Sequence, residues 1–95
     1  AGVLWKYAEC ARMFYALPEA EKSYLAVNAD DKKRGDFPLL FYRLGEVKKA
    51  QGDYRQARDY FEQFLKNPGG AETSFLEKAK IESEHCQWAL DETAK

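Results

Sequence analysis

The 95-residue sequence contains a single histidine, His85, and a single methionine, with two cysteines and three prolines. One imidazole leaves nucleophilic catalysis with one candidate base, and Cys10 and Cys86 fall on the first and last helical segments predicted below. Because successive residues on a helix point about 100° apart, Cys86 is not expected to pair with its neighbour His85. No phosphate-binding loop, paired-glycine fingerprint or metal-ligand cluster is present. We therefore predict that the chain is not an enzyme and holds no metal or cofactor.

Neither sign of charge is in excess, since 15 basic and 16 acidic residues give a net charge of −1. Nucleic-acid binding requires a basic patch or stripe, and attraction to an anionic membrane surface requires a basic cluster. No apolar run approaches the roughly 18 residues that a membrane-spanning helix needs, and no signal peptide is visible. We expect neither a nucleic-acid partner nor direct membrane insertion.

The two cysteines lie near opposite ends of the chain, and neither belongs to a pair with metal-ligand spacing. We expect Cys10 and Cys86 to be buried thiols that act as small hydrophobic side chains. A disulfide between them is the alternative.

An internal repeat organises the sequence. Shifting the chain by 37 positions places small residues on small residues and large apolar residues on large apolar residues. The aligned pairs are Leu4 with Phe41, Tyr7 with Leu44, Ala8 with Gly45, Leu17 with Tyr54, Ala20 with Ala57, Tyr24 with Phe61, and Val27 with Phe64. Within each unit these residues recur at spacings of three and four, which is the pattern of amphipathic helices.

Each unit is interrupted once, at residues 16–18 and again at residues 52–53, so each is predicted to be a helical hairpin. Pro18 suits the first turn of a new helix, and Asp53 is a plausible N-cap. The four small residues at equivalent positions are expected where paired helices approach closely: Ala8, Ala20, Gly45 and Ala57. Between the units, the polar stretch 28–36 is interpreted as a solvated loop, with a charged interaction loop as the alternative.

Residues 72–93 contain no helix breaker and predict a fifth helix. One face should pack on the second hairpin, and it consists of Phe75, Leu76, Ala79, Ser83, Cys86 and Leu90. Ile81, His85 and Trp88 form a second line. Either Trp88 folds back over the last hairpin, or the line forms an interdomain or dimer contact, so self-association through this helix is one outcome.

We predict an all-α fold of five helices: repeat one at 1–34, repeat two at 38–70 and a capping helix at 72–93, stacked as a right-handed superhelix in one domain. Residues 38–68 (PLLFYRLGEVKKAQGDYRQARDYFEQFLKNP) resemble a tetratricopeptide repeat. The matching positions are Phe41, Leu44, Gly45, Gly52, Tyr54, Ala57, Phe61 and Pro68. Residues 1–34 resemble a degenerate copy. Lys48 and Phe64 depart from the family's preferred tyrosine and alanine.

In such a stack the first helices of the hairpins line a concave surface. Candidate partner-binding residues on that surface are Trp5, Glu9 and Arg12 of the first repeat, with Tyr42, Glu46 and Lys49 of the second. They suit an extended peptide or a partner's helix. The alternative is that Trp5 packs against a preceding element, or that Tyr42 leans over its own hairpin. The resemblance also implies that a carboxylate-clamping site is absent, because acidic groups here would repel a carboxylate.

The stretch from Glu77 to Leu90 resembles the segment after tandem repeats in OmpA-family envelope proteins of Bacteroidetes. That resemblance implies a periplasmic, outer-membrane-associated scaffold, linked to secretion or gliding, and it would account for a chain that begins Ala1-Gly2 without methionine as an excised piece. The expected function is therefore protein–protein interaction. The alternatives are a cytosolic peptide-binding adaptor or a regulatory appendage of an absent catalytic domain.

Overall fold

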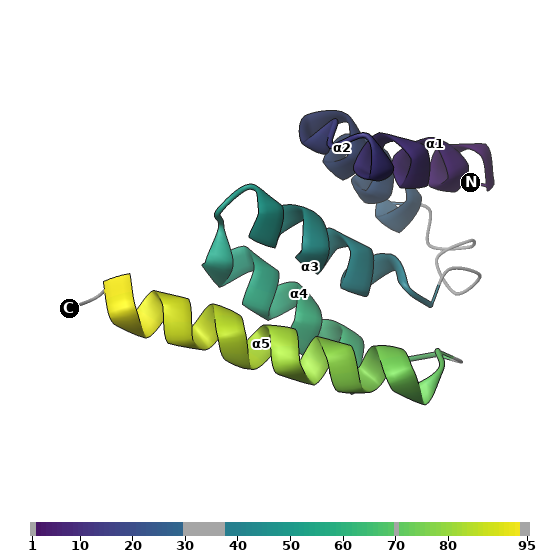
Figure 1. Cartoon of the computed structure of the whole chain (residues 1–95). Helices are drawn as coiled ribbons and strands as arrows, with labels where there is room; N and C mark the ends of the chain where they lie inside the picture. Colours follow the sequence, from purple (N-terminus) through teal and green to yellow (C-terminus); the bar gives the residue numbers. More distant parts are fainter. Residues whose placement is uncertain (1, 30–37, 70, 94–95) are drawn as a thin grey trace.

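The computed structural model describes residues 2–29, 38–69 and 71–93, and these residues form helices and turns without any strand. The helices are α1 (Gly2–Met13), α2 (Leu17–Ala29), α3 (Leu40–Ala50), α4 (Tyr54–Lys66) and α5 (Thr73–Thr93) (Figure 1). The prediction of an all-α fold with five helices is confirmed.

The helices are stacked in chain order. α1 packs on α2, α3 packs on α4, and α5 packs along α4, while α2 and α3 join the two hairpins (Figure 1). The molecule measures 42 × 27 × 20 Å, so it is elongated along one axis. A row of stacked helices exposes a larger fraction of each helix to solvent than a spherical packing of the same helices would. Long surfaces along the sides of the stack are therefore exposed.

The predicted helix boundaries follow from local chemistry. Asp53 caps α4, because its side chain accepts a hydrogen bond of 3.2 Å from the backbone N–H of Gln56. Gly52 before it has a φ of 86°, a left-handed conformation that favours glycine. α2 continues through Asn28 and Ala29, so the expected loop is wrong for these two residues. Residues 30–36 of that loop lie outside the described residues.

The four small residues lie between packed helices, as predicted. Ala8, Ala20 and Ala57 are fully buried, and Gly45 is buried on α3. A Cβ atom added to Gly45 would lie 2.7 Å from Cε1 of Phe61, closer than carbon atoms pack. Phe61 is itself fully buried, so its ring has no open space to move into. The close approach of α3 and α4 therefore requires glycine at position 45.

The buried side chains form two clusters, and α3 contributes to both. The first cluster joins the hairpins and consists of Ala8, Ala11, Ala20, Tyr24, Val27, Leu40, Leu44 and Val47. The second joins α3, α4 and α5 and consists of Tyr42, Ala57, Phe61, Phe64, Ala79 and Cys86. The central position of α3 explains why it is apolar on more than one side.

The packing face of α5 is confirmed, since Ala79 and Cys86 are fully buried and Phe75 and Leu76 pack against the second cluster. Ile81 and Trp88, on the other line, are 52% and 65% exposed. Trp88 therefore does not fold back over the hairpin.

The expectation that both cysteines are buried is wrong for Cys10. Cys86 is buried, whereas Cys10 is exposed, and both thiols are free. Cys10 lies on a side of α1 that carries several other exposed apolar residues, Val3 and Tyr7 among them. The helical spacing identified an apolar side of α1 but could not show that no described helix covers it.

Replacing Ala57 with leucine should destabilise the protein by about 1–3 kcal/mol, because the larger side chain overpacks a fully buried position between α3, α4 and α5. Gln56→Leu is a matched control, since the neighbouring side chain is exposed and should tolerate leucine within about 0.5 kcal/mol. Urea denaturation of both variants would measure this difference. Equal losses would contradict the packing described for α4.

Candidate functional site

Three adjoining hollows form a groove across α3. The first lies between the α1–α2 turn and α3, and it is lined by Arg12, Met13, Tyr15, Leu17, Glu46, Val47 and Ala50. The second shares Glu46 and Ala50 with the first, and adds Tyr42, Lys49, Tyr54 and Glu82. The third shares Lys49 and Tyr54 with the second, and ends at His85, Trp88 and Ala89 of α5. Each hollow shares lining residues with the next, so the three lie in a row across α3, and we call this row the groove.

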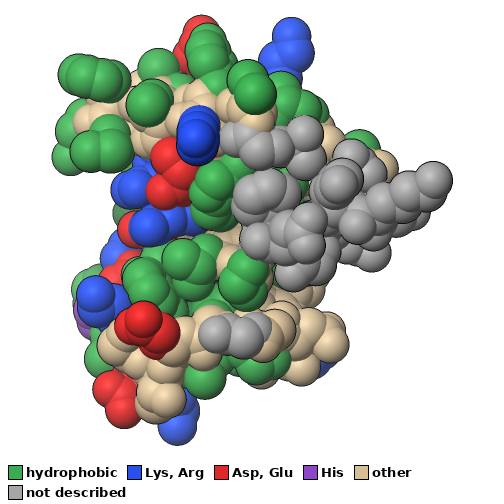
Figure 2. All heavy atoms as spheres, turned by 90° about the vertical axis from the view of Figure 1, so that its right-hand side faces the viewer, with side chains coloured by type: hydrophobic (Ala, Val, Ile, Leu, Met, Phe, Trp, Pro, Cys, Tyr) green, Lys and Arg blue, Asp and Glu red, His purple; other side chains and the backbone are tan. Residues whose placement is uncertain are grey.

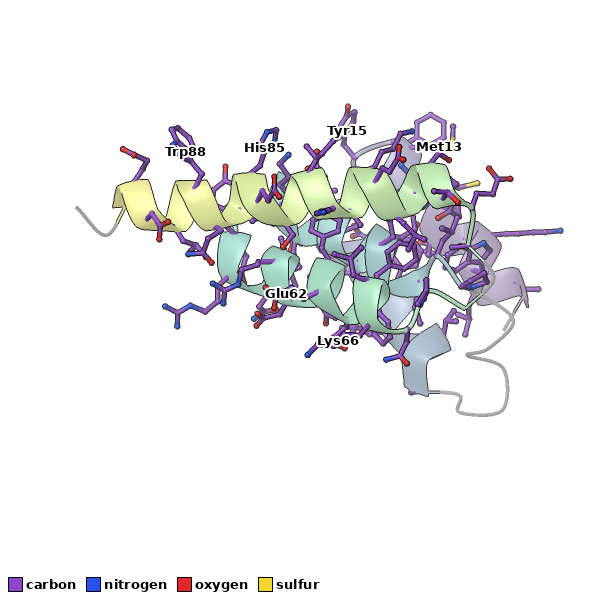
Figure 3. All side chains as sticks on the ribbon, turned by 90° about the horizontal axis from the view of Figure 1, so that it is seen from below. Met13, Tyr15, Glu62, Lys66, His85 and Trp88 are labelled. Carbon is purple, nitrogen blue, oxygen red and sulfur yellow. The ribbon has the colours of Figure 1, made fainter. Side chains whose placement is uncertain are left out.

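The two ends of the groove are apolar and open to solvent. Met13 and Tyr15 are 68% and 81% exposed at one end, and Trp88 is 65% exposed at the other. Figure 3 shows Met13, Tyr15, His85 and Trp88 projecting from the same side of the molecule, opposite Glu62 and Lys66 of α4. The groove therefore brings together part of the two sets of candidate residues that the sequence suggested separately: Arg12, Tyr42, Glu46 and Lys49 from α1 and α3, with His85 and Trp88 from α5. Trp5, Glu9 and Ile81 do not line it.

The centre of the groove is charged, and each of its charges has an ion-pair partner within or beside the groove. Arg43 on α3 lies 3.2 Å from Glu9 on α1 and 2.7 Å from Glu46 on its own helix. Arg12 lies 3.5 Å from the same Glu9 carboxylate. These contacts tie α1 to α3 through a run of alternating charges.

A second ion pair ties α3 to α5, between Lys49 and Glu82. With it, each of the four charged residues Arg12, Glu46, Lys49 and Glu82 that line the groove is paired with a charge of opposite sign. Glu9 and Arg43, which pair with Arg12 and Glu46, do not line it. Pairs that are partly exposed contribute little stability individually, about 0–1 kcal/mol each. Their larger effect is to keep the groove electrically neutral and its side chains in place.

The buried Tyr24 contacts the ion pairs of Glu9 with Arg12 and Arg43 through its hydroxyl group. Its fully buried ring packs edge-on against Trp5, with ring centroids 5.3 Å apart, and its hydroxyl donates a hydrogen bond to Glu9. Burial, together with the hydrogen bond to the Glu9 carboxylate, raises the pKa of the Tyr24 phenol above its ordinary value. The phenol therefore stays protonated and holds Glu9 where Arg12 and Arg43 reach it.

The two aromatic residues proposed for partner contact have different surroundings from those expected on an open surface. Tyr42 is only 6% exposed, and its ring packs against Phe61, Phe64 and Phe75 at centroid distances of 5.8, 5.6 and 5.4 Å. Trp5 is half-buried against the first cluster. Tyr42 therefore lies at the floor of the groove, with little of its side chain accessible to a partner. A role for Tyr42 or Trp5 in partner contact stays a prediction.

The sequence did not indicate several residues that shape the groove. Arg43 and Glu82 complete the ion pairs, and Met13 and Tyr15 form the open apolar end. One feature of the sequence could have indicated the exposed apolar end. Residues 13–15 are three successive large apolar residues just before a predicted break. Since successive residues on a helix cannot all face the core, at least one of them was to be expected at the surface. Tyr15 has a φ of 59°, a left-handed conformation that does not continue the helix, and α1 ends at Met13.

The described residues offer no arrangement for metal binding, since they bring together no group of three or more histidine, cysteine or acidic side chains suited to an ion. No helix among them combines the length and apolarity needed to cross a bilayer.

Comparison with protein-family models, with curated proteins and with solved structures finds no match to this chain.

Removing the Tyr24 hydroxyl should weaken folding at neutral pH by about 1–2 kcal/mol, because Glu9 loses a hydrogen-bond donor. The raised pKa adds a pH dependence. The stability it reflects is fully present below the unfolded-state pKa of about 10 and is lost as the pH rises above that value. Tyr24→Phe should therefore flatten part of the alkaline decline in unfolding free energy, measured by denaturant titration at several pH values.

Burial also raises the pKa of Tyr42, Tyr60 and Cys86, so some alkaline decline should remain in the Tyr24→Phe variant. Tyr7→Phe is the control, because Tyr7 is 55% exposed and its loss should not change stability at neutral pH. An alkaline slope identical in the wild type and Tyr24→Phe would contradict the role assigned to the phenol.

Proposed function

We propose that this protein is an interaction module that binds a segment of another protein in the groove across α3. The observation that carries the proposal is the row of adjoining hollows that forms this groove, from the exposed Met13 and Tyr15 to the exposed Trp88. Aromatic and methionine side chains are enriched where proteins contact each other, because they bury large apolar areas. Exposed at both ends of one groove, they supply two anchor points.

The paired charges define the chemistry of the bound segment. The groove presents two bases, Arg12 and Lys49, and two acids, Glu46 and Glu82, and each already has an ion-pair partner. A strongly charged ligand therefore gains no net attraction and must disrupt existing pairs. The preferred ligand is an extended segment of low net charge with large apolar side chains toward both ends. Its polar backbone groups can hydrogen-bond to the charged side chains at the centre.

The same proposal includes the family of the module and its cellular location. The hairpins, with small residues at their crossings and a capping α5, have the features that the tetratricopeptide resemblance implies. The resemblance of the α5 segment to OmpA-family envelope proteins supports a periplasmic, outer-membrane-associated scaffold, linked to secretion or gliding, as the setting in which the groove acts.

The groove can be tested by selecting binders from a phage-displayed library of random peptides and measuring their affinity by fluorescence anisotropy. Trp88→Ala and Tyr15→Ala should each weaken the selected peptides by about tenfold or more, equivalent to about 1.4 kcal/mol. Selected sequences should have low net charge and large apolar residues toward both ends.

Phe14→Ala is the matched control for Tyr15→Ala, because Phe14 lies in the same turn and is 84% exposed but does not line the groove. Its effect on affinity should be small. The proposal fails if Phe14→Ala weakens binding as much as Tyr15→Ala, or if the selected peptides bind Trp88→Ala and the wild type equally well.

A further inference from the structure

A second apolar surface lies on the side of the first hairpin that faces away from α3. Val3, Leu4 and Tyr7 of α1 line it and are 82%, 41% and 55% exposed. The α2 side contributes Glu19, Lys22, Ser23 and Ala26. Figure 2 shows hydrophobic side chains gathered on the end of the molecule formed by α1 and α2. We call this surface the open face, and it shares no lining residue with the groove.

The internal repeat identifies what kind of surface the open face is. A shift of 37 positions takes Val3, Leu4 and Tyr7 to Leu40, Phe41 and Leu44. Leu40 and Leu44 are almost fully buried, and Phe41 is packed against the same cluster, because these residues of α3 contact α2. The open face of the first hairpin is therefore the counterpart of the face by which the second hairpin packs on α2.

We propose that the open face is a docking surface for a partner helix with the apolar stripe of α2. In α2 that stripe is Ala20, Tyr24 and Val27, a small, an aromatic and a β-branched residue separated by four and three positions. All three are fully buried in the first cluster, which α3 completes with Leu40, Leu44 and Val47. A helix with this pattern meets large apolar side chains on the open face at the same three positions at which α2 meets them on α3. This proposal is independent of the groove.

One difference between the two faces determines what the partner must add. In the second hairpin, Tyr60 of α4 stacks on Phe41 with centroids 6.1 Å apart and fills the space beside α2. The equivalent position in the first hairpin is Ser23, a much smaller residue. The surface beside Leu4 is consequently hollowed, and a large side chain of the partner helix can occupy the place that Tyr60 takes in the second hairpin.

A second copy of this chain does not offer such a helix. The α2 stripe is covered by α3, and the equivalent stripe of α4, formed by Ala57, Phe61 and Phe64, is fully buried in the second cluster with α5. Among the described helices, no stripe of the required pattern is left uncovered. The partner is therefore a different polypeptide segment, and self-association through the open face would contradict the proposal.

The test uses the whole protein and a synthetic peptide with the sequence of residues 17–29 and one change, Ala26→Glu, so that a lactam bridge between the Lys22 amine and the introduced carboxyl group can hold the peptide helical. Both positions lie away from the α2 stripe. Binding is measured by isothermal titration calorimetry. Tyr7→Lys should weaken binding at least tenfold, because it places a charge in the centre of the apolar face. Phe14→Lys adds the same charge at an exposed position off the face and should leave affinity unchanged. Circular dichroism verifies that both variants are folded.

The two cysteines give a second readout. Cys10 occupies the position equivalent to Val47, which is buried where α3 meets α2, so a docked helix should protect the exposed Cys10 from a thiol reagent. Cys86 is buried in both states and serves as the internal reference. Protection of Cys10 by the peptide in the wild type and its loss in Tyr7→Lys would support the proposal.

Three results would overturn it. The first is a peptide that does not bind, and the second is binding that Tyr7→Lys leaves intact. The third is a dimer in sedimentation velocity that Tyr7→Lys converts to a monomer, because the occupant would then be a second copy. Trp88→Ala should not change binding of this peptide, so failure here is distinguishable from failure of the groove.

Discussion

The contact between Gly45 of α3 and the ring of Phe61 on α4 sets the spacing on which the rest of the molecule depends. A Cβ atom at position 45 would lie 2.7 Å from that ring, so any other residue would push the two helices apart. At the observed spacing Phe61 also contacts Tyr42, and Tyr42 in turn contacts Phe75 of α5. The position of α5, and with it one end of the groove, therefore follows from the absence of a single side chain.

The groove combines a fixed floor with open ends. Tyr42 of α3 lies almost fully buried below the charged residues. In the first hairpin, Tyr24 of α2 holds Glu9 of α1 in place through a hydrogen bond. Because these side chains are already ordered, a ligand of the proposed site would not have to immobilise them. The exposed Tyr15 and Trp88 would still lose side-chain freedom on contact. Such a site would select ligands by shape and by their apolar ends more than by charge.

Much of the fold was predictable because it depends on residues close in sequence. The periodicity around Ala8, Ala20, Gly45 and Ala57 predicted the crossings, and Asp53 predicted the start of α4. The site was less predictable. Helical spacing places Tyr42 on one line with Glu46 and Lys49, but it cannot show that Phe75, distant along the chain, covers the Tyr42 ring. The exposure of Cys10 was missed for the same reason, since burial depends on which neighbouring helix is present.

α3 supplies Leu44 to one buried cluster and Tyr42 to the other, so the two cores are joined through one helix. In stacked hairpins, stability is the sum of each unit's own free energy and that of its interfaces with its neighbours. Unravelling α3 would remove side chains from both cores at once, whereas fraying of α1 or of the end of α5 would affect only one. The molecule should consequently lose structure from its ends inward, and α3 should be the last segment to exchange its amide hydrogens with solvent.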